Sequence, residues 1–374
     1  MKKLNKKMLL DLKHQIYNEI GEVLTINTQN FSINGSVMFN NKKCFFKIID
    51  GDNFLKEING YFACNGNLPI NNIVFTKKLS SKMYIILYEF DKIVTENSGL
   101  LNDILVENDK SELISEQNLF YLNNVLSVYD TIYSKKTVNL DKSANDIFFI
   151  ERINTRLKVW YKDLIKSNKK IIINNNINVS ISNILSETIH YFEESNIIHS
   201  SVLTQGDPNT LNISIKPSFF DLVTAGYNSI VSEVAITIIS TLLYDNYFCP
   251  HYHPNSYGTH VQAINNYHLF KPNLTFDEND DELVINSNII TSNIRKKYIL
   301  DYINILKKNN IIINSEIKYY IVMRLMCVFN INTMEKSDYY YSLFLICYFY
   351  SNITDDFYDS VTNIIQEMGV LKYD

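Results

Sequence analysis

The first 90 residues carry short apolar runs separated by turn residues, a pattern typical of an antiparallel sheet. Residues 23–49 alternate between apolar and polar positions and are interrupted at Asn34-Gly35 and at Asn40-Asn41-Lys42. Such interruptions between apolar runs favour tight hairpin turns. We therefore predict a meander of strands here, followed by a short helix and two further strands. The predicted helices cover residues 8–20 and 53–63, and the later strands cover residues 73–75 and 84–88.

The pattern changes after Asp91, where apolar residues recur at helical spacing. From about residue 228 onward the chain also reads as largely helical, with breaks that include an acidic loop at residues 277–282. A small sheet region before a large helical region predicts an α+β, bilobal fold. We expect an N-terminal lobe at residues 1–91 and a C-terminal lobe at residues 92–374, with a ligand cleft near residues 89–92. The other stretches of helical spacing are residues 98–134, 148–168 and 180–196.

Composition and charge exclude several classes of protein. The chain has 374 residues, is 46% hydrophobic and carries a net charge of -5. This size suits two lobes, and the charge does not fit a basic nucleic-acid-binding surface. The five cysteines are odd in number and far apart, which fits a reducing compartment. No apolar run approaches the roughly 18 to 20 residues of a membrane span. We expect a cytoplasmic protein with no nucleic-acid partner and no membrane partner.

Residues 202–229 differ from the rest of the chain because acidic and amide side chains stand at the ends of apolar runs. Asp207 and Asn212 are five residues apart, but Asp163 and Asp281 are each followed by an asparagine at the same spacing. Only Asp207 follows a short apolar run and a glycine, and only this pair has a second apolar-flanked aspartate, Asp221, nearby. The alternative interpretation is a plain turn with Asp221 as a helix cap.

These three residue types suit phosphoryl transfer. A carboxylate held on a loop at a strand end, such as Asp207, can accept a proton from an incoming hydroxyl group. The amide oxygen of Asn212 and the carboxylate of Asp221 are hard oxygen ligands, which Mg²⁺ prefers alongside waters and phosphates. A base together with an Asn/Asp magnesium pair is the set of groups that phosphoryl transfer requires.

The segments QGDPNTLN at residues 205–212 and FFDL at residues 219–222 resemble the catalytic core of the aminoglycoside phosphotransferase family. The family pattern is H-G-D-x-x-x-x-N followed by an apolar-flanked aspartate. The resemblance implies a bilobal protein-kinase-like fold, with Asp207 as the catalytic base and Asn212 and Asp221 as ligands of Mg²⁺. It also implies ATP or GTP as co-substrate, and the sequence does not choose between them.

The chain departs from the family pattern at Gln205, which stands where the family usually has a histidine. Glutamine can still form hydrogen bonds with the loop backbone, but it cannot carry charge. Gly226 and Glu233 are the candidates for the glycine and the helix-opening acidic residue that often follow in the family.

A kinase-like N-terminal lobe also needs a lysine on its third strand and a partner glutamate on the next helix. Lys47 lies on the third predicted strand, and Glu57 lies on the following predicted helix. Lys56 precedes Glu57 directly, so only one of the two can face the cleft. The alternative is an exposed strand lysine and a solvated helix glutamate.

Two further nucleotide contacts are expected. The turn at residues 31–36 would cover the phosphates through backbone N–H groups and Ser36, although a plain hairpin turn explains this segment equally well. Adenine would form hydrogen bonds with the backbone near Glu89, Phe90 and Asp91, where side-chain identity matters little.

The acceptor is expected to be a small molecule with a hydroxyl group, such as an aminoglycoside-like antibiotic, an amino alcohol or a sugar. Only about ten residues separate Asp221 from the next helical pattern, which leaves little room for the peptide platform of a protein kinase. The acidic loop at residues 277–282 is a candidate lining for a cationic acceptor. The cysteine and histidines at residues 249–253, with His260, are a weak zinc candidate, because they lack the C-x-x-C or H-x-x-x-H spacing of paired zinc ligands. The alternatives are a catalytically impaired, nucleotide-binding protein with a regulatory role, and a purely helical interaction protein.

Overall fold

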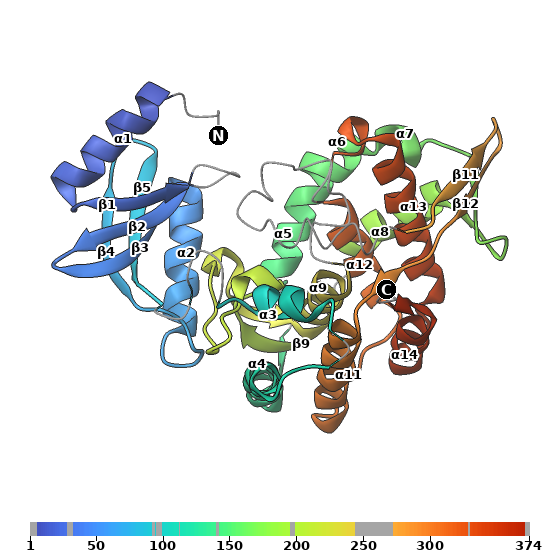
Figure 1. Ribbon diagram of the computed structural model, residues 1–374. Helices are drawn as coiled ribbons and strands as arrows, with labels where there is room; N and C mark the ends of the chain where they lie inside the picture. Colours follow the sequence, from blue (N-terminus) through green and yellow to red (C-terminus); the bar gives the residue numbers. More distant parts are fainter. Residues whose placement is uncertain are drawn as a thin grey trace.

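The computed structural model (Figure 1) is α+β, as the sequence predicts. A five-stranded antiparallel sheet with two helices forms the N-terminal part, and the C-terminal part is mainly helical. The structure describes residues 6–27, 33–91, 94, 99–111, 113–139, 142–194, 199–243, 272–327 and 330–370. Within that part of the chain, no helix is both long and apolar enough to cross a lipid bilayer.

The N-terminal sheet has the strand order β1-β2-β3-β5-β4. Figure 1 shows helix α1 along one side of this sheet and α2 on the side nearer the helical part. The strands are β1 (Val23–Asn27), β2 (Ile33–Phe39), β3 (Lys42–Asp50), β4 (Ile73–Lys78) and β5 (Met83–Glu89), and the helices are α1 (Lys6–Glu19) and α2 (Gly51–Cys64).

Alternation along β3 decides which way Lys47 points. Cys44, Phe46 and Ile48 are buried in one apolar cluster with Ile16 of α1. Residues of the opposite parity face the other side of the sheet, where Ile49 packs with Phe54 and Ile58 of α2. Because successive side chains of a strand point to opposite faces, Lys47 lies on the α2 face of the sheet.

The predicted hairpin turn at Asn34-Gly35 is wrong. Both residues lie inside β2, paired with Lys47 and Phe46 of β3. A Cβ atom on Gly35 would lie 2.1 Å from the carbonyl oxygen of Thr25, so the glycine allows β1 to approach closely. Ser36 is therefore a buried strand residue, with its Oγ 2.8 Å from Thr25 Oγ1, rather than part of a turn. Phe31 and Ser32 of the predicted turn lie outside the described residues.

The C-terminal part is built around one large apolar cluster. Helix α9 lies within it, and twelve of its thirteen residues are buried. The helices are α3 (Leu101–Asn108), α4 (Glu116–Ser134), α5 (Ala144–Arg152), α6 (Lys158–Trp160), α7 (Lys162–Ile165), α8 (Ile181–Glu194), α9 (Ile230–Leu242), α11 (Asn293–Lys308), α12 (Ile317–Met326), α13 (Lys336–Asn352) and α14 (Phe357–Glu367). A π-helical turn, η1 (Ile153–Leu157), joins α5 to α6, and the 3-10 turns are η2 (Thr210–Asn212), η3 (Leu222–Thr224) and η6 (Ile331–Thr333).

Short strands complete this part. They are β6 (Thr137–Asn139), β7 (Lys170–Ile173), β8 (Ile177–Ser180), β9 (His199–Thr204), β10 (Gly226–Ser229), β11 (Thr275–Glu278), β12 (Glu282–Asn286), β13 (Ile290–Thr291) and β14 (Gly369–Val370). The strands β10, β9 and β6 form one sheet, and β11, β12, β7 and β8 form another.

The acidic segment at residues 277–282 is a hairpin rather than a free loop within a helical region. Its ends belong to β11 and β12, and β12 pairs in parallel with β7, where Ile171 and Ile173 are buried. Glu278 pairs with Lys169 at 2.8 Å and accepts a hydrogen bond from Tyr340. The hydrogen bond from Lys169 lowers the pKa of Glu278, so this carboxylate already has a cationic partner within the fold.

A buried ion pair joins three helices behind the site. Asp109, next to the end of α3, and Arg295 of α11 are both fully buried, and Arg295 Nε lies 2.9 Å from Asp109 Oδ1. Arg295 Nη1 also donates to the carbonyl oxygen of Thr241 in α9, and Ser292 Oγ donates to Asp109. The pair therefore fixes α3, α9 and α11 relative to one another.

Candidate active site

Most residues of the candidate active site lie on the long loop that connects β9 to β10. These strands pair antiparallel, with Thr204 opposite Gly226, so residues 205–225 leave and return at one place. Gly206 opens the loop with φ +89°, and a Cβ atom there would lie 2.2 Å from the carbonyl oxygen of Thr224. Only glycine combines this backbone conformation with so close an approach.

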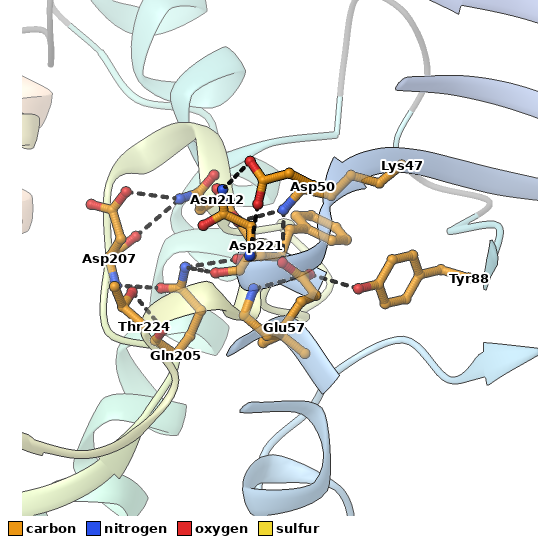
Figure 2. Close-up of polar contacts among 12 residues, drawn as sticks. Lys47, Asp50, Glu57, Tyr88, Gln205, Asp207, Asn212, Asp221 and Thr224 are labelled. Carbon is orange, nitrogen blue, oxygen red and sulfur yellow. Dashed lines mark hydrogen bonds and ion pairs between the residues drawn. The ribbon is translucent and has the colours of Figure 1, made fainter. Parts of the chain in front are cut away.

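A tight hairpin then brings Asp221 back toward Asn212. Phe220 N donates to Asn212 O at 2.9 Å, and Ser214 N donates to Ser218 O at 2.9 Å. The short spacing between Asn212 and Asp221 in the sequence is therefore the length of this hairpin. In Figure 2 the side chains of Asn212 and Asp221 lie between Asp207 and Lys47.

Asp207 has one oxygen engaged by the loop and one without a hydrogen-bond donor. Its Oδ2 accepts hydrogen bonds from Asn209 Nδ2 at 2.9 Å and from Asn212 Nδ2 at 3.3 Å. Its Oδ1 is buried and accepts no hydrogen bond from the described part of the chain, while Arg324 Nη1 lies 3.4 Å away as an ion-pair partner. A buried carboxylate oxygen without a donor is a ready acceptor for a hydroxyl proton.

Gln205 ties the two aspartate-bearing segments together. Its Nε2 donates to the carbonyl oxygens of Phe220, at 2.7 Å, and Asp221, at 2.8 Å, while its Oε1 accepts from Asp207 N at 2.9 Å. The residue is 2% exposed. A neutral amide supplies both donors and the acceptor that this position needs, so the departure from histidine has a structural explanation.

Lys47 of β3 joins the N-terminal sheet to this loop. Its Nζ lies 2.8 Å from Glu57 Oε2 and 2.6 Å from Asp221 Oδ1. Burial alone would lower the pKa of Lys47, but the carboxylates of Asp221 and Glu57 outweigh burial and raise it. Lys47 is therefore held as a cation at the junction of the two parts.

Glu57 is the member of the adjacent pair on α2 that faces the site, and Lys56 points away toward Glu151. Glu57 is 1% exposed and accepts hydrogen bonds from Tyr88 Oη at 2.6 Å and Leu222 N at 3.2 Å. Burial, together with the Glu57 charge, raises the pKa of Tyr88, so its hydroxyl stays a donor. Glu57 is thus fixed by contacts from both β5 and the loop.

Asp221 adopts a left-handed backbone conformation, with φ 60° and ψ 78°. This conformation is uncommon for a residue with a side chain and occurs often at functional sites. The hydrogen bonds from Gln205 to Asp221 O and from Leu222 N to Glu57 hold the residue from both sides.

The residues fit a magnesium ion. Asn212 donates through its Nδ2 to the carbonyl and carboxylate oxygens of Asp207. Its Oδ1 therefore points away from Asp207. Asp221 remains about half exposed, at 48% for its side chain. One amide oxygen and one carboxylate suit Mg²⁺, which takes its remaining ligands from phosphates and water. Among the described residues, no group of three or more His, Cys, Asp or Glu side chains is placed to hold a metal.

Glu233 lies beneath the loop in the first turn of α9 and is fully buried. Its Oε1 accepts hydrogen bonds from Thr204 Oγ1 at 2.8 Å and Asn145 Nδ2 at 3.3 Å. Burial raises the pKa of Glu233 to about 8, even though the Thr204 hydrogen bond acts to lower it. Asn228 donates to Thr204 Oγ1 and Thr224 O, which extends this buried network to the end of the loop.

The last residue of β5 and the residue after it are already in contact with neighbouring side chains and backbone groups. Glu89 N donates to Asn72 O at 2.9 Å, and Asn71 Nδ2 donates to Glu89 O at 3.3 Å. Lys43 Nζ lies 3.9 Å above the ring of Phe90. The adenine contacts near Glu89, Phe90 and Asp91 stay a prediction. The N–H of Glu89 already donates to Asn72 O and would not be available to adenine.

Sequence reasoning missed Arg324, which pairs with Asp207, and Tyr88, which donates to Glu57. It also missed Thr224, whose Oγ1 donates to the carbonyl oxygen of Gln205. Arg324 was visible as a charge that interrupts an apolar helical run, but nothing local indicates that α12 brings it to Asp207. The histidine- and cysteine-containing segment at residues 249–260, considered above for zinc, lies outside the described residues.

The chain is similar to several solved structures. One is a thermostable mutant of aminoglycoside phosphotransferase APH(4)-Ia in a ternary complex with ADP and hygromycin B, with 14% identity over 69% of this chain and 90% of that chain and a TM-score of 0.41. Another is the amicoumacin kinase hAmiN in complex with AMP-PNP, Ca²⁺ and Ami, with 10% identity over 96% and 97% of the two chains and a TM-score of 0.46. A third is aminoglycoside phosphotransferase APH(3'')-Id from Streptomyces rimosus, with 10% identity over 81% and 99% and a TM-score of 0.40.

No protein-family model matches the chain, and no curated protein matches it in sequence. The three structures are thus two aminoglycoside phosphotransferases and an amicoumacin kinase.

Proposed function

We propose that the protein is a small-molecule kinase that transfers the γ-phosphoryl group of ATP or GTP to a hydroxyl group. The observation that carries this proposal is the convergence of two sets of residues. Lys47 and Glu57 come from the N-terminal sheet and α2, while Asp207, Asn212 and Asp221 come from the loop after β9. Lys47 joins the two sets directly through Asp221.

Asp207 is the proposed base. Its Oδ1 lacks a hydrogen-bond donor among the described residues, while Asn209 and Asn212 hold the other oxygen. The acceptor hydroxyl would donate to Oδ1 and give up its proton there as its oxygen bonds to the γ-phosphorus. The bond from that phosphorus to the β–γ bridging oxygen breaks at the same time, and ADP or GDP leaves.

Asn212 and Asp221 are the proposed magnesium ligands, and Lys47 is the proposed partner of the α- and β-phosphates. Bound Mg²⁺ would neutralise charge on the phosphates. Lys47 is kept in position for its phosphate partners by Glu57, which is itself fixed by Tyr88 and the N–H of Leu222.

The short connection after Asp221 favours a small acceptor. Only η3 and β10 lie between Asp221 and the start of α9 at Ile230. A protein kinase uses a long segment in this place to hold its peptide substrate. We therefore propose a small hydroxyl compound rather than a protein as the acceptor.

Phosphoryl transfer from labelled ATP and GTP, with Mg²⁺ and a panel of aminoglycosides, macrolides, amino alcohols and sugars, tests the proposal. Asp207→Asn should lose any activity found, by about 10²-fold or more. Asp163→Asn is the matched control, because Asp163 is exposed and has an asparagine at the same spacing. An active Asp207→Asn protein would refute the base assignment. Nucleotide binding that ignores Mg²⁺, with no transfer to any acceptor, would instead favour a regulatory nucleotide-binding protein.

A further inference from the structure

Three arginines lie near Cys327, at the end of α12, and one of them also pairs with Asp207. Arg152 ends α5, Arg156 lies four residues later in the π-helical turn η1, and Arg324 lies in the last turn of α12. Arg324 Nη1 is 3.4 Å from Asp207 Oδ1, and Arg156 Nη1 donates to the carbonyl oxygen of Cys327 at 2.5 Å. Single π-helical turns occur frequently at functional sites, and this one contains Arg156 and directly follows Arg152.

The charges of Arg156 and Arg324 both act on Arg152. Burial and the charge of Arg156 lower the pKa of Arg152 to about 10, and Arg324 adds to this effect, while Asp207 opposes it. Two carboxylates have other partners, because Glu151, next to Arg152, pairs with Lys56, and Glu193 of α8 pairs with Lys158.

Helix packing explains Arg156 but does not explain Arg152. Arg156 donates to a carbonyl at the C-terminal end of α12, a common stabilising position for a cation. The guanidinium of Arg152 lies 4.0 Å above the ring of Phe148, and its Nε is buried with no hydrogen-bond acceptor among the described residues. A buried donor of this kind is rare in folded proteins unless another molecule supplies the acceptor.

We propose that the hydroxyl acceptor also carries an anionic group, a carboxylate or a phosphate, which binds Arg152 and Arg324. This inference rests on the phosphotransferase function proposed above. The site has a buried donor without an acceptor at Arg152 Nε and a buried acceptor without a donor at Asp207 Oδ1. A molecule with an anion and a hydroxyl group satisfies both.

Guanidinium geometry and the local charge favour this class of acceptor. The Nε and Nη edge of a guanidinium pairs with both oxygens of a carboxylate or phosphate. An anion would also offset the positive charge that Arg156 and Arg324 place near Arg152. A polycation such as an aminoglycoside would instead meet the like charges of Arg152 and Arg324 near the proposed base, so it is a poor fit to this site.

Binding of inorganic phosphate tests the anion site without knowledge of the acceptor. The titration is carried out with Mg²⁺ and saturating ADP, so that the nucleotide phosphate positions are filled. Wild type and Lys162→Gln, which removes an exposed cation nearby in the sequence, should bind phosphate equally. Arg152→Gln and Arg324→Gln should each weaken binding by about tenfold or more, because each removes a charge-assisted hydrogen-bond donor. Arg152→Lys keeps the charge but cannot form the bidentate hydrogen bonds of a guanidinium, so it should also weaken binding.

Equal affinity in wild type and Arg152→Gln, or no phosphate binding by wild type, would overturn the proposal. Replacing ADP with AMP-PNP separates the two possible sources of the anion. Phosphate should still bind, whereas its exclusion by AMP-PNP would show that the arginines hold the γ-phosphoryl group and would overturn the assignment to the acceptor.

The outcomes also separate this inference from the proposed function. A protein that binds nucleotide but no phosphate overturns only the anionic acceptor. A protein that binds phosphate through Arg152 but binds no nucleotide overturns the phosphotransferase function and the acceptor assignment with it. In turnover assays, glycerate should be a better acceptor than glycerol and a sugar phosphate better than the free sugar. A preference for the neutral member of a pair would contradict the proposal.

Discussion

The side-chain amide of Gln205 donates to the backbone carbonyl of Asp221 at 2.8 Å, across sixteen positions of the sequence. The same side chain accepts from the N–H of Asp207. One neutral residue therefore sets the spacing between the proposed base and a proposed metal ligand. This spacing depends on hydrogen bonds rather than on charge at position 205.

Gln205→Glu should disrupt the site more than Gln205→His. A carboxylate would still accept from Asp207 N but would direct an oxygen at the carbonyls of Phe220 and Asp221, whereas histidine can still donate. Loss of the buried bonds should cost about 1–3 kcal/mol in the free energy of unfolding. Denaturant unfolding and Mg²⁺-dependent nucleotide affinity measure the two effects. If Gln205→Glu matches wild type in both, the bridging role is wrong.

Glu233 should make stability depend on pH. In the unfolded chain its carboxyl has the ordinary pKa of 4.5. In the folded protein burial raises this pKa to about 8, so the carboxyl stays protonated over a wider range of pH. Between these values the folded state binds more protons, so the free energy of unfolding should fall as the pH rises from about 4.5 to about 8. Above pH 8 this contribution levels off.

Glu233→Gln provides the matched control for that pH dependence. The amide keeps the shape of the protonated carboxyl and cannot ionise, so the variant should lose this part of the fall in stability. Urea unfolding at a series of pH values makes the comparison. Parallel curves for wild type and Glu233→Gln would show that Glu233 is ionised in the folded protein throughout the range.

The Arg295–Asp109 pair should matter chiefly for stability. Arg295→Met leaves the Asp109 carboxylate buried without its main partner, which should cost about 3–5 kcal/mol. The double change Arg295→Met with Asp109→Leu removes both charges and should recover much of this loss. Urea unfolding of the single and double variants tests the pair, and a double variant no more stable than Arg295→Met would contradict this account.

Gly206→Ala should disable the loop, because its φ is +89° and its Cβ would lie 2.2 Å from Thr224 O. Gly66 is the matched control, with φ +78° and nothing within 4 Å of an added Cβ. Gly66→Ala should cost only about 1–2 kcal/mol, from the left-handed backbone alone. Thermal unfolding should therefore show a much larger loss for Gly206→Ala, and equal losses would mean that the close approach to Thr224 is unimportant.

Local patterns predicted the parts of the fold in which one face is buried. Alternation along β3 placed Lys47 on one side of the sheet, and the neighbouring Lys56 and Glu57 had to face different ways. The Asn34-Gly35 pair was predicted as a turn, but glycine also occurs within strands where a neighbouring strand approaches closely. Its environment depends on Thr25 in the facing strand, which a local pattern does not reveal.

Contacts between distant segments could not be predicted from one sequence. The parallel pairing of β12 with β7 joins segments about 110 positions apart. The sequence predicted no element at residues 170–173 and a largely helical region where β12 lies. The ion pair of Arg324 with Asp207 depends on how α12 packs against the loop. The candidate residues at 207–221 could be picked out because strand ends and turn residues lie together there, whereas the three arginines come from segments far apart in the sequence.

The most direct test of the central claim is the affinity for AMP-PNP, measured by calorimetry with Mg²⁺ and with EDTA. Wild type should bind about tenfold or more tightly with Mg²⁺. Asp221→Ala should remove this dependence on Mg²⁺, and Lys47→Met should weaken binding under both conditions, while Asp163→Asn should match wild type. Equal wild-type affinity with Mg²⁺ and with EDTA would contradict the proposal that Asn212 and Asp221 hold the metal of a kinase site.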